Sequence, residues 1–176
     1  MRRSEIDLEK RLWVIPAERS KNKHAHTVPL SDLAMELIEE AMRKTNGDIL
    51  FPNRAGDAAI KHRAIDCALR LAQTPRKGLP LGKFGIPVWK PHDLRRTGGT
   101  HLSLRENGLM VSVMDRAHVL NHRSVTRGSI TDTAYNLNEF ELEKRDVLEK
   151  WARFLGELIK REMDQRQGTA TAVSGQ

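Results

Sequence analysis

The stretch KPHDLRRTGGTHL, residues 90–102, places a histidine three residues before a pair of arginines. On a helix, residues three and four apart are neighbours, so His92 would lie beside both Arg95 and Arg96. An imidazole next to planar guanidinium donors suits a phosphate oxygen, which arginine can bind through two hydrogen bonds. A helix that begins just after Pro91 would add the free N–H groups of its first turn. Alternatively, His92 caps the helix and the arginines face solvent; this stretch alone leaves both interpretations open.

A second group of chemistry-bearing residues lies in HVLNHRSVTRGSITDTAYNLNEF, which begins at His118. His118 and His122 are one helical turn apart, and Tyr135 is the only tyrosine in the sequence. A phenol that attacks a phosphodiester forms a covalent ester and conserves the bond energy for rejoining, with no metal or nucleotide cofactor. In isolation, the tyrosine is better explained as a half-buried amphipathic residue.

The polar segment ERSKNKHAHTVPLS, residues 18–31, contains Lys21 and Lys23. A lysine can donate a proton to a leaving oxygen where its surroundings lower its pKa. Taken alone, these two lysines are more simply explained as surface charge.

Composition limits the class of protein. The chain has 176 residues, 39% of them hydrophobic, which is enough for a single domain with one core. A total of 30 Lys and Arg against 23 Asp and Glu gives a net charge of +7, which favours a polyanionic partner. Cys67 is the only cysteine, so an internal disulfide is excluded, and its apolar neighbours favour a small buried side chain. The opening MRRSEIDLEK is neither a signal peptide nor a membrane span, so we expect a cytoplasmic protein.

The elements that must position these residues are mostly helices. Leu12–Ile15 and His24–Leu30 predict a β-hairpin, with its turn in the polar run 18–23. Helices are predicted from a Ser31 cap to 47, and over 57–73, 92–106, 111–120 and 139–163. The segment GLPLGKFGIPVWKP, with three Gly and three Pro, predicts a loop. We therefore expect an α+β, mostly α fold with a small antiparallel sheet, one domain over 1–164, and a disordered tail over 165–176.

Together these segments resemble one family closely, the tyrosine recombinases of phages and genomic islands. PHDLRRT is similar to the family's HxLR box, and ITDTAY to its nucleophile box. VLNH is similar to a later box of the family, which reads Leu, then Gly or Asn, then His. The basic hairpin that ends in VPLS resembles the segment that carries the family's lysine. The order of the four pieces, and the thirteen residues from His122 to Tyr135 (135 − 122), are most similar to prophage and island integrases. The resemblance covers about Ser4 to Phe154.

The resemblance implies that Tyr135 is the nucleophile, which forms a 3′-phosphotyrosyl bond and frees a 5′-hydroxyl. It also implies that Arg95 binds the non-bridging oxygens as charge builds in the transition state. The family uses the first arginine of its pair, which selects Arg95 over Arg96.

Three further roles follow from the same resemblance. His92 would assist proton transfer, His122 would donate a hydrogen bond to the phosphate, and Lys21 would protonate the departing 5′-oxygen. Lys21 is preferred to Lys23 because its distance to the VPL strand matches the family pattern.

The resemblance further implies the mostly α catalytic domain of this family and a catalyst that needs no cofactor. The expected partner is double-stranded DNA at an attachment or recombination site, with self-association into a tetrameric synapse. We expect no membrane partner, and action at the bacterial nucleoid within the cytoplasm.

One feature of the family pattern is missing. Family members carry another arginine on a helix before the first strand, followed shortly by Glu. RRSEI offers Arg3, but SEIDLEKRLWVIP resembles the segment after that helix, and Lys21 is only eighteen residues away (21 − 3). We therefore expect the arginine to precede Met1, with the catalytic domain truncated and the DNA-clamping domains absent. Losing one oxyanion-type donor lowers a rate by about 10²–10³, so we expect poor or absent turnover.

Two other classes remain as alternatives. The chain could be a non-catalytic DNA-binding module or a decayed integrase remnant, in which the same cations only grip the DNA backbone. It could also bind a metal through His24 and His26 or through His118 and His122, although neither pair has further ligands nearby in the sequence. The last helix fits equally well a core position in its own domain or docking on a neighbouring protomer.

Overall fold

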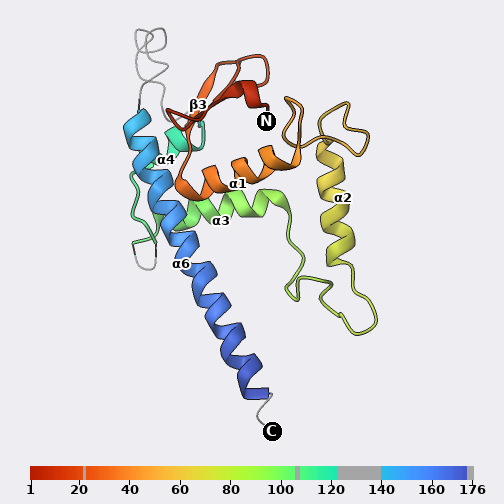
Figure 1. Ribbon diagram of the computed structural model, residues 1–176. Coiled ribbons are helices and arrows are strands. Elements are labelled where there is room, and N and C mark those ends of the chain that lie inside the picture. The colour runs from red at the N-terminus through yellow and green to blue at the C-terminus, as the bar shows by residue number, and fades with distance from the viewer. Residues whose placement is uncertain (22, 106–107, 123–139, 174–176) are drawn as a thin grey trace.

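The computed structural model describes residues 1–21, 23–105, 108–122 and 140–173. Its fold is α+β and mostly α, which confirms the predicted class (Figure 1). The elements in chain order are η1 (Arg3–Glu5), β1 (Ile6–Asp7), β2 (Leu12–Ile15), β3 (His26–Pro29), α1 (Asp32–Lys44), α2 (His62–Gln73), α3 (Pro91–Ser103), α4 (Val113–Val119) and α6 (Glu141–Val173).

The sheet is antiparallel with the order β1-β2-β3. The predicted hairpin forms between β2 and β3, where Leu12 pairs with Pro29 and Ile15 with His26. Sequence analysis missed β1, which pairs through only two residues, Ile6 with Trp13 and Asp7 with Leu12. A strand this short has no alternation to detect.

The hydrophobic core lies between the sheet and α1. Its buried centre consists of Leu30, Ile38 and Leu50, with Trp13 and Met35 among the side chains packed against it. Ser31 caps α1 as predicted, because its hydroxyl accepts a hydrogen bond from the backbone N–H of Ala34. This core holds the hairpin against α1.

Helix α2 begins five residues later than the sequence pattern predicts (62 − 57). Residues 52–59 form a tight turn instead, closed by an antiparallel bridge between Pro52 and Ala59. The Asn53 side chain accepts from the backbone N–H of Gly56 at 2.8 Å, which stabilises a non-helical path. The prediction that Cys67 is buried was also wrong: Cys67 is exposed, because the apolar side of α2 is largely uncovered and Ile65 and Leu71 beside it are exposed too.

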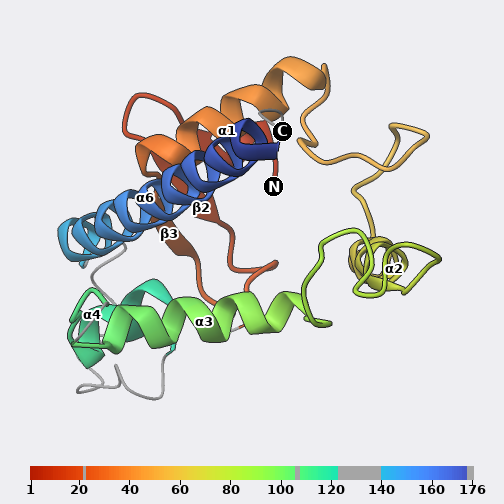
Figure 2. The same cartoon turned by 90° about the horizontal axis from the view of Figure 1, so that it is seen from below.

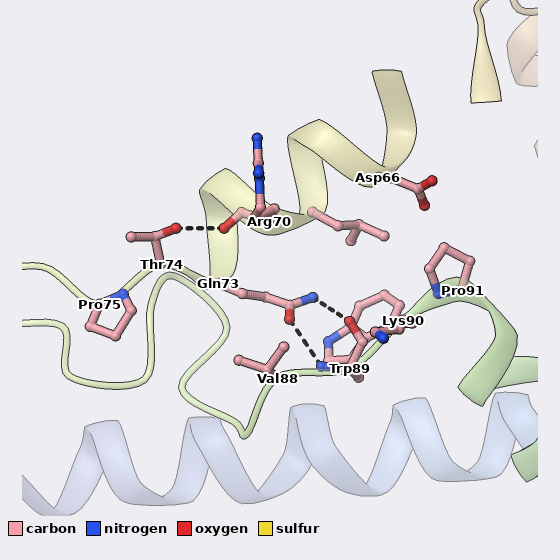
Figure 3. Close-up of a pocket in the computed structure, with 10 residues that line it drawn as sticks. Asp66, Arg70, Gln73, Thr74, Pro75, Val88, Trp89, Lys90 and Pro91 are labelled. Atoms are coloured by element: carbon pink, nitrogen blue, oxygen red, sulfur yellow. Dashed lines mark hydrogen bonds between the residues drawn. The ribbon is translucent and has the colours of Figure 1, made fainter. Parts of the chain in front are cut away.

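The loop that enters α3 is tied to the end of α2 by Gln73 (Figure 3). Gln73 is 4% exposed; its amide donates to the backbone carbonyl of Trp89 and accepts from the Trp89 N–H, both at 2.9 Å. These residues border a cavity of about 530 Å³ lined mainly by apolar groups, Leu69 and Val88 among them. Gln73 therefore fixes the chain just before the His92 helix.

Helix α6 runs past α1, α4 and β3 (Figure 2). Its C-terminal half extends away from the other elements, as the view in Figure 1 shows. Its near half packs on α3 through aromatic rings: His101 lies 5.2 Å from Phe154 and 6.5 Å from Trp151, measured between ring centroids. The helix continues to Val173, so residues 165–173 are helical where the sequence predicts a disordered tail. Helix hydrogen bonds are local, and the polar sequence there holds no proline to end them.

Candidate active site

The first turn of α3 presents His92 and is fixed by its own residues. Pro91 occupies the first helical position, where its missing N–H costs nothing. The Asp93 carboxylate accepts from the backbone N–H of Lys90 at 2.9 Å, which closes the turn. His92 is exposed at this end, one turn before Arg95, as the sequence predicts.

The second part of the site is the C-terminal end of α4. Asn121 has φ +55°, in the left-handed region that Gly and Asn tolerate best. This turn lets the backbone N–H of His122 reach back to the carbonyl of Ala117 at 2.8 Å, and that of Asn121 to His118 at 3.3 Å. The pattern is a Schellman motif, which gives a physical reason for Asn in VLNH. The motif aims His122 off the end of α4.

Arg95 joins the two helix ends. Its Nη2 atom donates to the carbonyl of Leu120 at 2.5 Å and lies 3.0 Å from Nε2 of His122. Because arginine has no acceptor, a hydrogen bond between the two side chains requires Nε2 of His122 to accept. Arg95 and His122 are both exposed, and the Arg96 side chain forms no hydrogen bond with the described part of the chain.

This pair has the chemistry of an anion site. An oxygen of a phosphate that approached both residues would accept N–H bonds from Arg95 and displace its contact with His122. Nε2 of His122 would then be free to carry a proton and to donate to the same phosphate. Both helix ends are fixed by backbone hydrogen bonds, so the pair is preorganised.

The remaining predicted residues stand apart from this pair in the described structure. Lys21 is exposed in the turn between β2 and β3, with no hydrogen bond to Arg95, His92 or His122 among the described residues. Tyr135 lies outside the described residues. The structure thus brings together two of the five predicted site residues, and places a third on the same helix as Arg95.

The first two arginines are both engaged elsewhere. The guanidinium of Arg3 donates to the carbonyls of Met42 and Thr45, and to that of Gly47 at 3.0 Å. Arg2 forms an ion pair with Asp48 at 3.0 Å. The pKa of the Asp48 carboxyl is lowered to about 2, mainly by the hydrogen bond from the Ser4 backbone N–H and secondly by Arg2. Arg3 therefore binds the C-terminal end of α1, where the free carbonyls attract a cation.

Comparison with known proteins decides the family. Residues 1–139, well over half of the chain, match the family described as "Phage integrase family". The chain is a member of the phage integrase family. It is 29% identical over 150 residues to the prophage integrase IntA of Escherichia coli (strain K12), an alignment that covers 84% of this chain and 32% of that protein. The chain therefore spans about a third of the length of this relative. No solved structure matches it at a significant level.

The aromatic contact between α4 and the start of α6 in this integrase-family chain was not predicted from the sequence. The ring of His118 stacks on that of Phe140, with centroids 3.8 Å apart and planes 20° apart. Phe140 has φ +64°, a strained conformation for a bulky residue, at the start of α6. The two rings are far apart in sequence and belong to no periodic pattern, so the sequence motifs do not predict their contact.

A buried cation beside the sheet was not predicted from the sequence either. Lys144 on α6 is 9% exposed, and its Nζ atom donates to the carbonyl of Thr27 on β3 at 3.3 Å. Burial lowers the pKa of Lys144, partly offset by Glu141. Burial, and then the charge of Lys144, lowers the pKa of His26 to about 4, so His26 is neutral at pH 7.

Two other kinds of feature, a metal-binding cluster and a membrane-spanning helix, are absent from the described ranges. No group of three or more His, Cys, Asp or Glu side chains that could hold a metal occurs in them. Within the same ranges, no helix is both long and apolar enough to cross a membrane.

Proposed function

We propose that this chain is the catalytic domain of a site-specific DNA recombinase, which cuts and rejoins strands through a 3′-phosphotyrosine. The observation that carries the proposal is the pair of Arg95 and His122, held 3.0 Å apart at two exposed helix ends. Phage integrase family membership and the net charge of +7 support DNA as the substrate. We assign the domain to residues 1–164.

The proposed step uses the five predicted residues. The Tyr135 oxygen attacks phosphorus, the bond to the 5′-oxygen breaks, and the phenol loses its proton. Arg95 and His122 bind the non-bridging oxygens, and His92 assists proton transfer. Lys21 gives a proton to the departing 5′-oxygen. Rejoining is the reverse, in which a 5′-hydroxyl attacks the phosphotyrosine, so no cofactor is consumed. Self-association on DNA would bring two such sites together.

The test is covalent trapping on a nicked duplex. The duplex carries the candidate attachment site beside the gene, with a nick close to the cleavage position so that a short cleaved strand diffuses away. We expect a protein–DNA band that survives denaturation and is absent with Tyr135→Phe. A band that persists in this variant would rule out the assigned nucleophile.

A second candidate is a DNA-binding chain that does not cleave by itself. The engagement of Arg2 and Arg3 at the end of α1 favours it, because neither is then available as a further phosphate ligand. It predicts salt-dependent binding to the same duplex with no covalent band. A trapped band from this chain would exclude it.

A further inference from the structure

Lys144 is a buried cation that the proposed chemistry does not use. Lysine is almost never fully buried unless it is paired, yet Lys144 is 9% exposed in the first turn of α6. Its Nζ atom donates to the backbone carbonyl of Thr27 at 3.3 Å. Its neighbour Arg145 donates to the carbonyl of Lys10 at 3.0 Å, in the turn between β1 and β2. Two adjacent cations thus connect α6 to β3 and to the turn between β1 and β2.

The contact with Thr27 falls on the edge strand of the sheet. Among the described residues, strand β3 pairs with β2 on one side and with no strand on the other, and α6 packs against β3. An edge strand leaves backbone carbonyls to be satisfied by a covering element, which here is α6. The pairing of β2 with β3 fixes the shape of the hairpin, whereas Lys144 contributes to where the hairpin lies relative to the helices.

The same turn of α6 is also joined to α4. Phe140, whose carbonyl accepts from the Lys144 backbone N–H at 2.9 Å, stacks on His118 of α4. Helix α4 ends at Val119, and His122, three residues further along the chain, contacts Arg95. A short chain of contacts therefore connects the hairpin that carries Lys21 with the Arg95–His122 pair, and Lys144 is its link to β3.

We propose that Lys144 is a positioning residue, which holds the β2–β3 hairpin where Lys21 can protonate the leaving 5′-oxygen. The proposal rests on the proposed function for the role of Lys21. Two charged or titratable side chains lie near it: the half-buried His26 of β3, and Glu141 on its own helix. A purely structural lysine would stabilise the fold without affecting this one proton transfer.

The first test measures the position of the hairpin without any DNA. Spin labels are attached at Lys21→Cys and Met114→Cys in a Cys67→Ser background, since residues 21 and 114 are exposed. We expect one narrow distance distribution, which Lys144→Met broadens or shifts and Lys144→Arg retains. The matched control is Lys150→Met, because Lys150 is an exposed lysine of the same helix, paired with Asp146. An unchanged distribution in Lys144→Met would overturn the proposal.

The second test uses the leaving group to isolate the proton transfer. In a duplex whose scissile 5′-oxygen is replaced by sulfur, the leaving thiol has a pKa near 8.5, against about 15.7 for water, so it departs without an acid. We expect Lys144→Met to slow cleavage of the ordinary duplex about tenfold or more at saturating DNA, with unchanged DNA affinity. The sulfur duplex should restore the rate of this variant and of Lys21→Ala, but not of Arg95→Ala.

The outcomes separate the two proposals. Equal losses on the oxygen and sulfur duplexes would show that Lys144 acts only through the fold and would overturn the positioning role. If the unsubstituted chain cleaves neither duplex, the proposed function fails, while the distance measurement still decides whether Lys144 positions the hairpin.

Discussion

The Arg95–His122 pair and the Lys21 hairpin are positioned by different kinds of interaction. Arg95 and His122 lie at two helix ends that are fixed by local rules, namely a proline at the first helical position and an asparagine in the left-handed region. The hairpin is placed by contacts between residues far apart in sequence, such as Lys144 with Thr27. Local rules can be recognised in the sequence, whereas the long-range contacts cannot, and the two regions should respond differently to substitution.

Removal of the arginine of the locally built pair should have the largest effect. We expect Arg95→Ala to lower the rate of strand cleavage by about 10²–10³, because one donor to the developing charge is lost. Arg96→Ala is the matched control on the same helix and should change the rate little, although it can weaken binding at high salt. Single-turnover cleavage on the nicked duplex measures both. Equal losses in the two variants would end the distinction between the paired arginine and its neighbour.

The second-largest effect is expected from acid, which should lower the stability of the hairpin region. The folded pKa of His26, about 4, lies below its ordinary 6.5 because the ring is partly buried and lies near the charge of Lys144, so the unfolded chain binds the extra proton more readily. Stability is therefore fully present above pH 6.5 and is lost as the pH falls towards 4, by about 1–2 kcal/mol once solvent screening of the half-buried ring is included.

Denaturant unfolding at several pH values tests this prediction. His26→Gln should flatten the slope between pH 6.5 and 4, while His24→Asn, an exposed neighbour, should leave it unchanged. A slope that survives His26→Gln would place the acid sensitivity elsewhere in the molecule.

A smaller effect is expected at the turn after α4. Asn121→Val puts a β-branched residue at φ +55°, which should cost about 1–2 kcal/mol and misplace His122. Asn121→Gly accepts the same conformation and should keep both stability and cleavage. If Gly and Val behave alike, His122 is not positioned by the Schellman motif and the local account of this region is wrong.

The smallest effect is expected at Phe140, in the segment that connects the two regions. Phe140→Ala loses the stack on His118 but retains a side chain at φ +64°, whereas Phe140→Gly loses the same ring and removes the strain. We expect the Gly variant to be more stable than the Ala variant by about 1 kcal/mol, the reverse of the usual order in a helix. Thermal unfolding of the pair measures it, and the usual order would show that the left-handed backbone is not present in solution.

Much of the fold could be predicted because its signals are local. The Ser31 cap, the proline before His92 and the VPLS strand each mark a boundary within a few residues of itself. The start of α2 could not be predicted, since an antiparallel bridge between Pro52 and Ala59 overrides a helical apolar pattern. Pairing of this kind depends on the tertiary structure around the segment and not on its own residue pattern.

The same division applies to the candidate site. The spacing of His92 and Arg95 on one helix follows from the sequence, and so does the place of His122 after α4. The engagement of Arg3 with carbonyls at the end of α1, more than 35 residues away, does not. Nor does the burial of Lys144, because ELEKRD has the composition of an exposed first helical turn. Both side chains contact residues that are distant in sequence and come together only once the chain has folded.

The most direct test of the central claim is to locate the covalent bond itself. The trapped adduct is digested with nuclease and trypsin, and the peptides are sequenced by mass spectrometry. We expect a nucleotide linked through its 3′-phosphate to Tyr135, in the tryptic peptide that covers residues 128–144. A nucleotide on any other residue of the chain would contradict the account.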